Sequence, residues 1–250
     1  LNIQKIMDYY QNQTPPPYNP QSYEQMQKAA QVQTNSVLKR VYVRMFIGLL
    51  ISAFCALGVA SSPAAIAFFL GNPFVYWGMF IAMLVMAFVI PARMEKMSTG
   101  TILVLFCIFC ALMGCSLASV FMIYTATSIT ATFFMAAGTF GAMSVYGYFT
   151  KTNLDKMGSI FIMALFGLFI AMIVNIFLKS SGLEWVISII GVLLFVGLTA
   201  WDTQQVKRLA QANLSPELTD KLATMGALNL YLDFINLFLF LLRIFGGGRD

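Results

Sequence analysis

The chain has 250 residues, of which 59% are hydrophobic and only 10% are charged. Its mean hydropathy of +0.79 excludes an ordinary water-soluble domain and indicates a polytopic membrane protein. The net charge of +5 does not indicate a nucleic-acid partner, because the basic residues are scattered between apolar runs and fit membrane topology better. Histidine is absent, which excludes zinc-hydrolase signatures and catalysis by Ser–His or Cys–His pairs.

The N-terminal segment, residues 1–36, is rich in Gln, Asn, Pro and Tyr and has no apolar period. This composition predicts a disordered tail. The segment does not resemble a signal peptide, because no apolar core follows a basic start and no small-residue cleavage site is present. We therefore expect two parts, a tail over 1–36 and a transmembrane domain over 37–250.

Apolar runs of about 20 residues, the length that an α-helix needs to cross a bilayer, recur through the second part. Helices satisfy their own backbone groups in lipid, so we expect an all-α fold with seven transmembrane helices and not a barrel. The predicted spans are Tyr42–Ala60, Pro73–Ile90, Thr101–Tyr124, Thr130–Phe149, Gly158–Leu178, Glu184–Gln205 and Thr224–Phe245.

The predicted loops alternate in charge. Of the 15 Lys and Arg residues, all except Lys179, Arg243 and Arg249 lie on the same side of the membrane as the N-terminus. Because basic residues concentrate on the cytoplasmic side, we expect the tail to be cytoplasmic and the C-terminus to lie on the opposite side.

The last predicted span, TMGALNLYLDFINLFLFLLRIF, carries Asn229, Asp233 and Asn236 in an otherwise apolar run. At 100° per residue these three side chains share one face with Phe240 and Arg243. An ionised carboxylate inside a membrane costs at least roughly 2.5 kcal/mol, so Asp233 is a candidate functional residue that needs a partner.

The sixth span supplies that partner. It ends GLTAWDTQQVKRLAQ and places Asp202 on one face with Thr199 and Thr203. Both aspartates lie in the cytoplasmic half of their spans at similar depth. The segment 209–222 predicts a short connecting helix, since Ser215-Pro216-Glu217 supplies a cap, a proline and an acidic first turn. We therefore expect the two spans to be antiparallel neighbours and the two aspartates to meet.

Two carboxylates that are close together in a low dielectric cannot both ionise cheaply, so the pair is expected to share a proton near neutral pH. Loss of that proton should separate the spans or recruit a cation, and calcium prefers oxygen ligands. We expect weak calcium binding at Asp202 and Asp233, which suits passage better than storage, with support from the polar groups of Thr199, Thr203, Asn229 and Asn236. The alternative is a surface Asp202 and an Asp233 that serves packing alone.

Two further features have less specific interpretations. Arg93 follows Pro91 at a predicted cytoplasmic boundary, where an arginine most often serves topology, and it is also a candidate counter-ion for the carboxylates. The four cysteines all lie inside predicted spans, so we interpret them as small buried apolar residues and not as disulfides or zinc ligands.

The motif GLTAWDTQQVKRLA followed by ALNLYLDFINLFLFLLRIFGG resembles the C-terminal signature of the Bax inhibitor family, also called the transmembrane BAX inhibitor motif family, in its bacterial branch. The resemblance runs from about Leu38 to the end. It implies six helices around a central seventh, a pH-sensitive calcium leak and a bacterial inner-membrane location. It also implies an aspartate-pair sensor at Asp202 and Asp233 and a second-span arginine near it, which falls on Arg93.

Several functions compete on this basis. The first is a pH-gated calcium leak channel, which is not an enzyme and needs no cofactor beyond the lipid bilayer, protons and the transported calcium. The alternative is a regulatory protein that binds and restrains a membrane AAA protease, a partner that the resemblance allows. An intramembrane aspartyl protease also places one Asp on each of two neighbouring helices, but its GxGD motif is absent before Asp233. Proton-coupled transport is weakened because no inverted repeat is evident.

Overall fold

The computed structural model describes residues 20–212 and 214–248, and this part of the chain is all-α. Seven of its helices are long and apolar enough to cross a membrane, as predicted. These are α2 (Pro20–Ala60), α4 (Pro73–Arg93), α5 (Thr99–Ile123), α6 (Ala126–Phe149), α7 (Asp155–Leu178), α8 (Ser181–Gln211) and α9 (Pro216–Phe245). The short helix α3 (Pro63–Phe69) follows α2, and a 3-10 turn, η1 (Met94–Lys96), follows α4.

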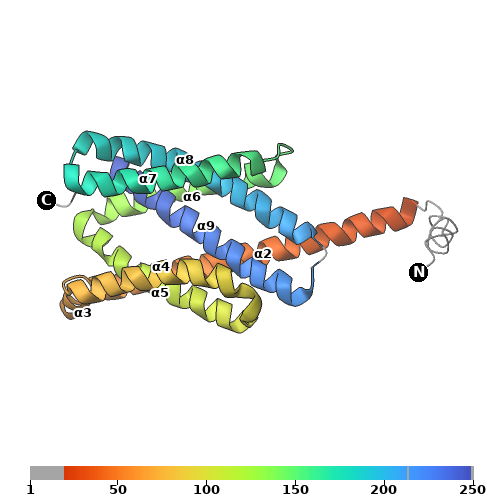
Figure 1. Cartoon of the computed structure of the whole chain (residues 1–250), viewed down its shortest axis with the longest axis horizontal. Coiled ribbons are helices and arrows are strands. Elements are labelled where there is room, and N and C mark those ends of the chain that lie inside the picture. Colours follow the sequence, from red (N-terminus) through yellow and green to blue (C-terminus); the bar gives the residue numbers. More distant parts are fainter. Residues whose placement is uncertain (1–19, 213, 249–250) are drawn as a thin grey trace, which may run out of the picture.

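The first helix begins much earlier than the sequence predicted. Helix α2 starts at Pro20 and projects beyond the bundle (Figure 1), so residues 20–36 are helical and do not form the predicted disordered tail. The physical reason is composition: Gln, Glu, Ala, Lys and Met are good helix formers, and a helix propagates easily from a span that is already formed. Residues 1–19 of the predicted tail lie outside the described residues.

The connection between α8 and α9 also differs from the prediction. The chain forms no separate short helix there, because the predicted segment is divided between the last turn of α8 and the first turns of α9. The predicted cap is confirmed: the Ser215 side chain accepts a hydrogen bond from the backbone N–H of Leu218, and Pro216 occupies the first turn. The result is one continuous α9 that reaches from the connection through the whole bundle.

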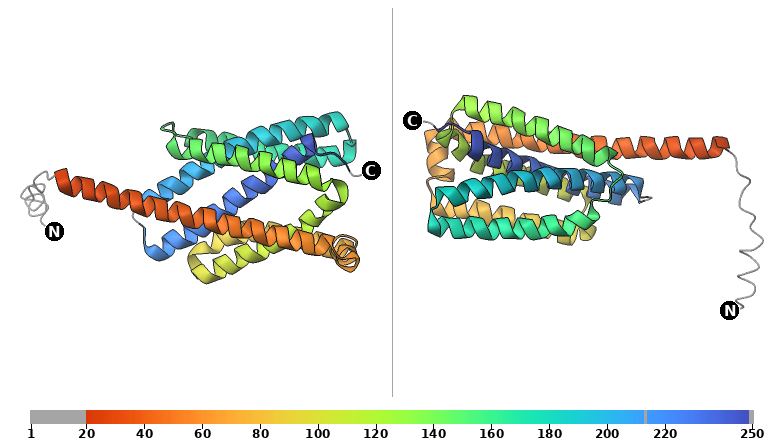
Figure 2. Two further views of the ribbon diagram at one scale, coloured as in Figure 1. Left: turned by 180° about the vertical axis from the view of Figure 1, so that it is seen from behind. Right: turned by 90° about the horizontal axis from the view of Figure 1, so that it is seen from above.

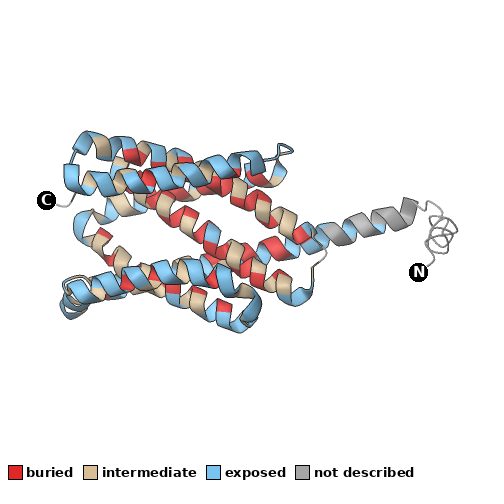
Figure 3. Cartoon of the chain, viewed as in Figure 1, coloured by how far each residue is buried: buried red, intermediate tan, exposed pale blue. Residues whose placement is uncertain are grey.

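Helix α9 lies at the centre of the fold. It packs against α2, α5, α6 and α8, and it crosses between the group α2–α5 and the group α6–α8 (Figures 1 and 2). In its most apolar stretch 67% of residues are buried, against 6% in the peripheral α7 (Figure 3). The predicted arrangement of a central seventh span is therefore confirmed.

The two ends of the bundle differ in charge. The basic end is formed by the N-terminal part of the α2 span and by the α4–α5, α6–α7 and α8–α9 connections, where ion pairs join Arg44 to Asp220 and Arg208 to Asp155. The opposite end, here called the far end, is formed by α3, the α5–α6 and α7–α8 connections and the C-terminal end of α9. This division positions the candidate site, which lies nearer the basic end.

Candidate functional site

Asp202 on α8 and Asp233 on α9 lie in the interface between two antiparallel helices. On the far-end side of the aspartates, the ring of Phe195 stacks on that of Phe240, with centroids 5.9 Å apart and planes 25° apart. On the basic-end side, Gly226 of α9 allows Val206 of α8 to approach closely, since a Cβ on Gly226 would lie 2.8 Å from a Val206 methyl carbon. Apolar contacts therefore close the interface on both sides of the aspartates.

The two carboxyl groups are direct neighbours. Asp202 is 8% exposed and Asp233 is 4% exposed, and the two carboxyl groups are close enough to interact electrostatically. Ionised carboxylates only accept hydrogen bonds, so these two groups can bond to each other only when one of them carries a proton. The Oδ2 atom of Asp233 is buried and has no hydrogen-bond partner within the described part of the chain. The structure thus places close together the pair that the sequence singled out, in a buried interface where two ionised carboxylates would repel each other.

No basic side chain of the described residues forms an ion pair with these aspartates. The ion pairs found among residues 20–212 and 214–248 engage Asp155, Glu217 and Asp220, and none reaches Asp202 or Asp233. The candidate counter-ion, Arg93, is exposed at the end of α4. The reason is the position of α4, which packs on α5 at the outside of the bundle. The structure therefore does not bring Arg93 to the aspartates.

The predicted hydroxyl groups on α8 have other partners. Thr203 Oγ1 lies 3.2 Å from the hydroxyl of Tyr42, so it joins α8 to α2. Thr199 Oγ1 donates a hydrogen bond to the Phe195 carbonyl oxygen of its own helix at 2.7 Å. Both threonines are fully buried, as expected from their face of the helix, but neither is bonded to the aspartates.

The predicted amides on α9 do not join the site either. Asn229 is exposed, and the Asn236 amide donates to the Leu232 carbonyl oxygen at 2.8 Å. The polar arc inferred from the sequence is wider than the strip of α9 that faces α8. Asp202 and Asp233 therefore supply the charge that would attract a cation, and none of the four predicted polar side chains is bonded to them. Within the described residues no group of three or more His, Cys, Asp or Glu could hold a metal ion.

A second buried polar cluster was missed in the sequence. The hydroxyl of Tyr231 lies 2.6 Å from Ser52 Oγ, which lies 2.7 Å from the Cys110 carbonyl oxygen. The Tyr231 ring makes edge contacts with Phe106 and Phe109. This cluster joins α9 to α2 and α5 two residues before Asp233. A tyrosine inside a span was the available signal, since a buried phenol needs a hydrogen-bond partner.

The residues that follow Asp202 hold the α6–α7 loop. Gln204 Oε1 accepts a hydrogen bond from the Leu154 N–H, and its Nε2 donates to the Thr152 carbonyl oxygen, both at 2.9 Å. Arg208 pairs with Asp155 at the start of α7. The polar end of α8 therefore fixes its neighbours as well as presenting Asp202.

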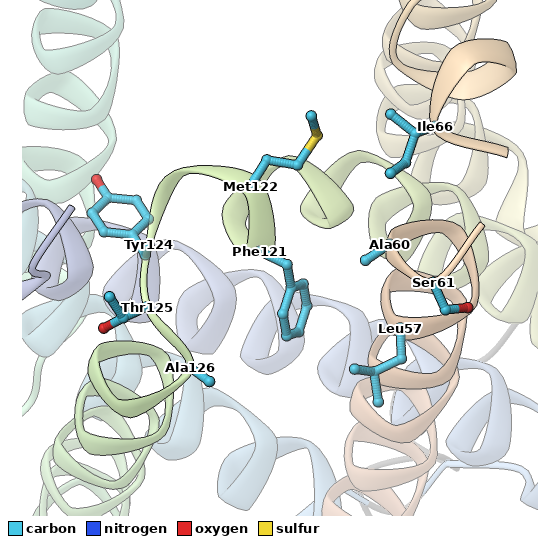
Figure 4. A pocket seen from close by; sticks show the side chains of 9 residues that line it. All are labelled: Leu57, Ala60, Ser61, Ile66, Phe121, Met122, Tyr124, Thr125 and Ala126. Atoms are coloured by element: carbon cyan, nitrogen blue, oxygen red, sulfur yellow. The ribbon is translucent and has the colours of Figure 1, made fainter. Parts of the chain in front are cut away.

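A hollow of about 570 Å³ opens at the far end (Figure 4). Its lining comes from the ends of α2, α5 and α6 and from α3, with Ser61, Tyr124 and Thr125 among the polar members. An inner groove of about 310 Å³ shares Leu57 and Phe121 with this hollow and reaches Ser52 and Phe234. Phe234 directly follows Asp233 in the chain, so the inner groove reaches the segment of α9 that carries this aspartate, although Asp233 itself does not line it.

Comparisons with known proteins agree with the motif. Residues 34–250 match the family described as "Inhibitor of apoptosis-promoting Bax1". The chain is 44% identical over 232 residues to "Inner membrane protein YbhL" of Escherichia coli (strain K12), covering 92% of this chain and 98% of that protein. It is 44% identical over 217 residues to an uncharacterized protein of Borreliella burgdorferi, covering 86% and 94%. It is 40% identical over 230 residues to "Uncharacterized protein YrjE" of Lactococcus lactis, with the same coverage.

Proposed function

We propose that this chain, which belongs to the Bax inhibitor family, is a pH-sensitive calcium leak channel gated by a proton shared between Asp202 and Asp233. We place the protein in the bacterial inner membrane, the location that the name of the Escherichia coli relative gives. The N-terminus and the basic end face the cytoplasm, because basic residues concentrate on that side.

The observation that carries the proposal is the close approach of two buried carboxyl groups that form no ion pair with a basic side chain of the described residues. A shared proton allows a hydrogen bond between them, and this bond holds α8 against α9. When the proton leaves, two carboxylates face each other in a low dielectric and repel. The interface then opens, or a cation enters between the charges, and calcium is the hard, oxygen-seeking ion that suits them.

Two further features favour a protein that lets calcium pass over one that stores it. None of the polar groups predicted to support a calcium site is bonded to the aspartates, since Thr199 and Asn236 donate to their own helix backbone and Asn229 is exposed. Two carboxylates with few further ligands hold a calcium ion weakly and release it readily. The far-end hollow and the inner groove supply part of a route from the opposite side of the membrane. The groove is mostly apolar, so the barrier to ions in this closed arrangement lies there and at the aspartate pair.

The experiment is calcium flux into liposomes that contain the purified full chain, measured with an encapsulated calcium dye across neutral pH. Flux is expected to rise as the pH rises and the shared proton is lost. In Asp202→Asn and in Asp233→Asn, the amide cannot ionise and can donate a hydrogen bond to the remaining carboxylate, so flux should stay low and lose its pH dependence. Glu95→Gln, an exposed acid at the basic end, is the matched control and should behave as the unaltered chain does. Equal pH profiles in all four proteins would reject the proposal.

A further inference from the structure

A groove of about 550 Å³ lies at the basic end between α2 and the first turns of α5. Its rim carries Lys39 and Arg40 of α2. Its deeper wall is apolar, formed by Val43 and Ile47 of α2 and by Leu103 and Cys107 of α5. The groove is separate from the aspartate pair and from the far-end hollow. The groove therefore has a positively charged rim and an apolar wall on the membrane-facing surface.

The rim has more positive charge than its neighbours neutralise. Arg44, which also borders the groove, donates to both carboxylate oxygens of Asp220, at 2.7 and 2.9 Å. Arg40 reaches the same carboxylate only at 3.2 Å, and 46% of its side chain remains exposed. Lys39 is exposed and forms no ion pair with any described residue. Two of the three basic side chains therefore share one carboxylate and Lys39 pairs with none, which leaves Lys39 and the weakly paired Arg40 available to an anion.

The apolar wall faces the bilayer. Val43 is 47% exposed and Ile47 is 46% exposed, and both belong to a helix that is apolar enough to span a membrane. A soluble anion would gain nothing from this wall. A phospholipid with a net negative head group would contact both parts, since basic pockets between transmembrane helices recognise such head groups.

We infer that this groove binds an anionic phospholipid, with the phosphate at Lys39 and Arg40 and one acyl chain along Val43, Ile47 and Leu103. The site lies beside the Arg44–Asp220 ion pair, so the bound lipid borders the contact between α2 and α9. The inference depends on the chain's place in a membrane and not on its transport of calcium.

The test uses the full chain in liposomes with a tryptophan introduced in the groove, Ile47→Trp, and lipids that carry bromine on the acyl chain. Bromine quenches a nearby tryptophan. The parent chain supplies the background of its three native tryptophans. Brominated phosphatidylglycerol should quench the introduced tryptophan at a concentration at least about fivefold lower than brominated phosphatidylcholine does. Phe88→Trp, on the exposed face of α4, reports the bulk lipid and should show no such preference.

Two double variants distinguish a site from general surface attraction. Lys39→Ala with Arg40→Ala should remove the preference at position 47. Arg93→Ala with Lys96→Ala removes two positive charges from the end of α4 and from η1, which lie at the same end of the bundle. This control pair should preserve the preference for phosphatidylglycerol at position 47. The inference would be overturned if both double variants lost the preference equally. It would also be overturned if the two lipids quenched equally in the Ile47→Trp chain that keeps Lys39 and Arg40. Displacement of the lipid by soluble glycerophosphoglycerol would overturn it as well, because that outcome assigns binding to the head group alone.

Discussion

The Nη2 nitrogen of Arg44 on α2 donates to both carboxylate oxygens of Asp220 at the start of α9, at 2.7 and 2.9 Å. The Nη1 nitrogen of Arg44 donates to the Asp220 carbonyl oxygen and to Thr224 Oγ1, both at 2.8 Å. This contact fixes the basic end of the central helix to the first span. In the sequence, Arg44 is one of the basic residues expected on the cytoplasmic side, and nothing in the pattern predicts this contact.

We predict that Asp220→Asn weakens this contact and lowers the free energy of unfolding by about 1 to 3 kcal/mol, because a half-buried guanidinium loses a charged partner. Arg44→Lys should also be destabilising, since a single ammonium nitrogen cannot take the places of Nη1 and Nη2 at once. Thermal unfolding in mild detergent measures both. Glu217→Gln provides the control, because its partner Lys221 lies on the same helix and Glu217 is 68% exposed. A control as damaging as Asp220→Asn would contradict the prediction.

The hydrogen bond between Tyr231 and Ser52 should contribute modestly to the junction of α9 with α2. We expect Tyr231→Phe and Ser52→Ala each to lower the free energy of unfolding by about 1 kcal/mol, and the double variant to cost less than the sum. A coupling energy near zero in this double-mutant cycle would show that the two hydroxyls do not depend on one another. Tyr76→Phe is the matched control, because Tyr76 is 42% exposed and lies in the first turn of α4, at the far end of the bundle.

Glycine has a specific role at one contact of α6 with α8. A Cβ on Gly147 would collide with the backbone of Ala200, two residues before Asp202, whereas nothing lies within 4 Å of a Cβ on Gly138 of the same helix. We predict that Gly147→Ala displaces α6 or α8 and costs about 1 to 3 kcal/mol of stability. Gly138→Ala should be neutral or stabilising, because alanine favours the helix. Thermal unfolding of the two variants compares them directly, and equal effects would refute the role assigned to Gly147.

Much of this fold was predictable because lipid imposes simple rules on sequence. The length and spacing of apolar runs predict the seven spans, and the cap at Ser215 was predicted as the start of a helix, although of a short connecting helix and not of α9. The aspartate pair was predictable because an acid in a span is costly and the two motifs place one acid at similar depth on each of two neighbouring helices.

The details of the site were harder to predict for physical reasons. A hydroxyl or amide in a span can donate its hydrogen bond to a backbone carbonyl oxygen of its own helix, as Thr199 and Asn236 do. The periodicity of the sequence does not show which partner such a side chain takes. The position of Arg93 depends on which helices lie outside the bundle, and this is a property of packing between spans. The helical start at Pro20 reflects propensity in a segment without apolar period, where a pattern search has no signal.

The gating proposal also predicts a change of shape that can be measured without calcium. The experiment uses a chain whose native cysteines are replaced by alanine, with new cysteines at Gln211 and Glu217. Both positions are exposed and lie at the adjoining ends of α8 and α9. Spin labels on the two new cysteines report the distance between these helix ends. As the pH rises across neutrality, loss of the shared proton leaves two facing carboxylates, so the measured distance should become longer and broader. Adding Asp233→Asn should keep it short, because an amide and a carboxylate remain hydrogen bonded at every pH. A pH response that survives this substitution would assign proton sensing to other groups, even if calcium flux itself proved to depend on pH.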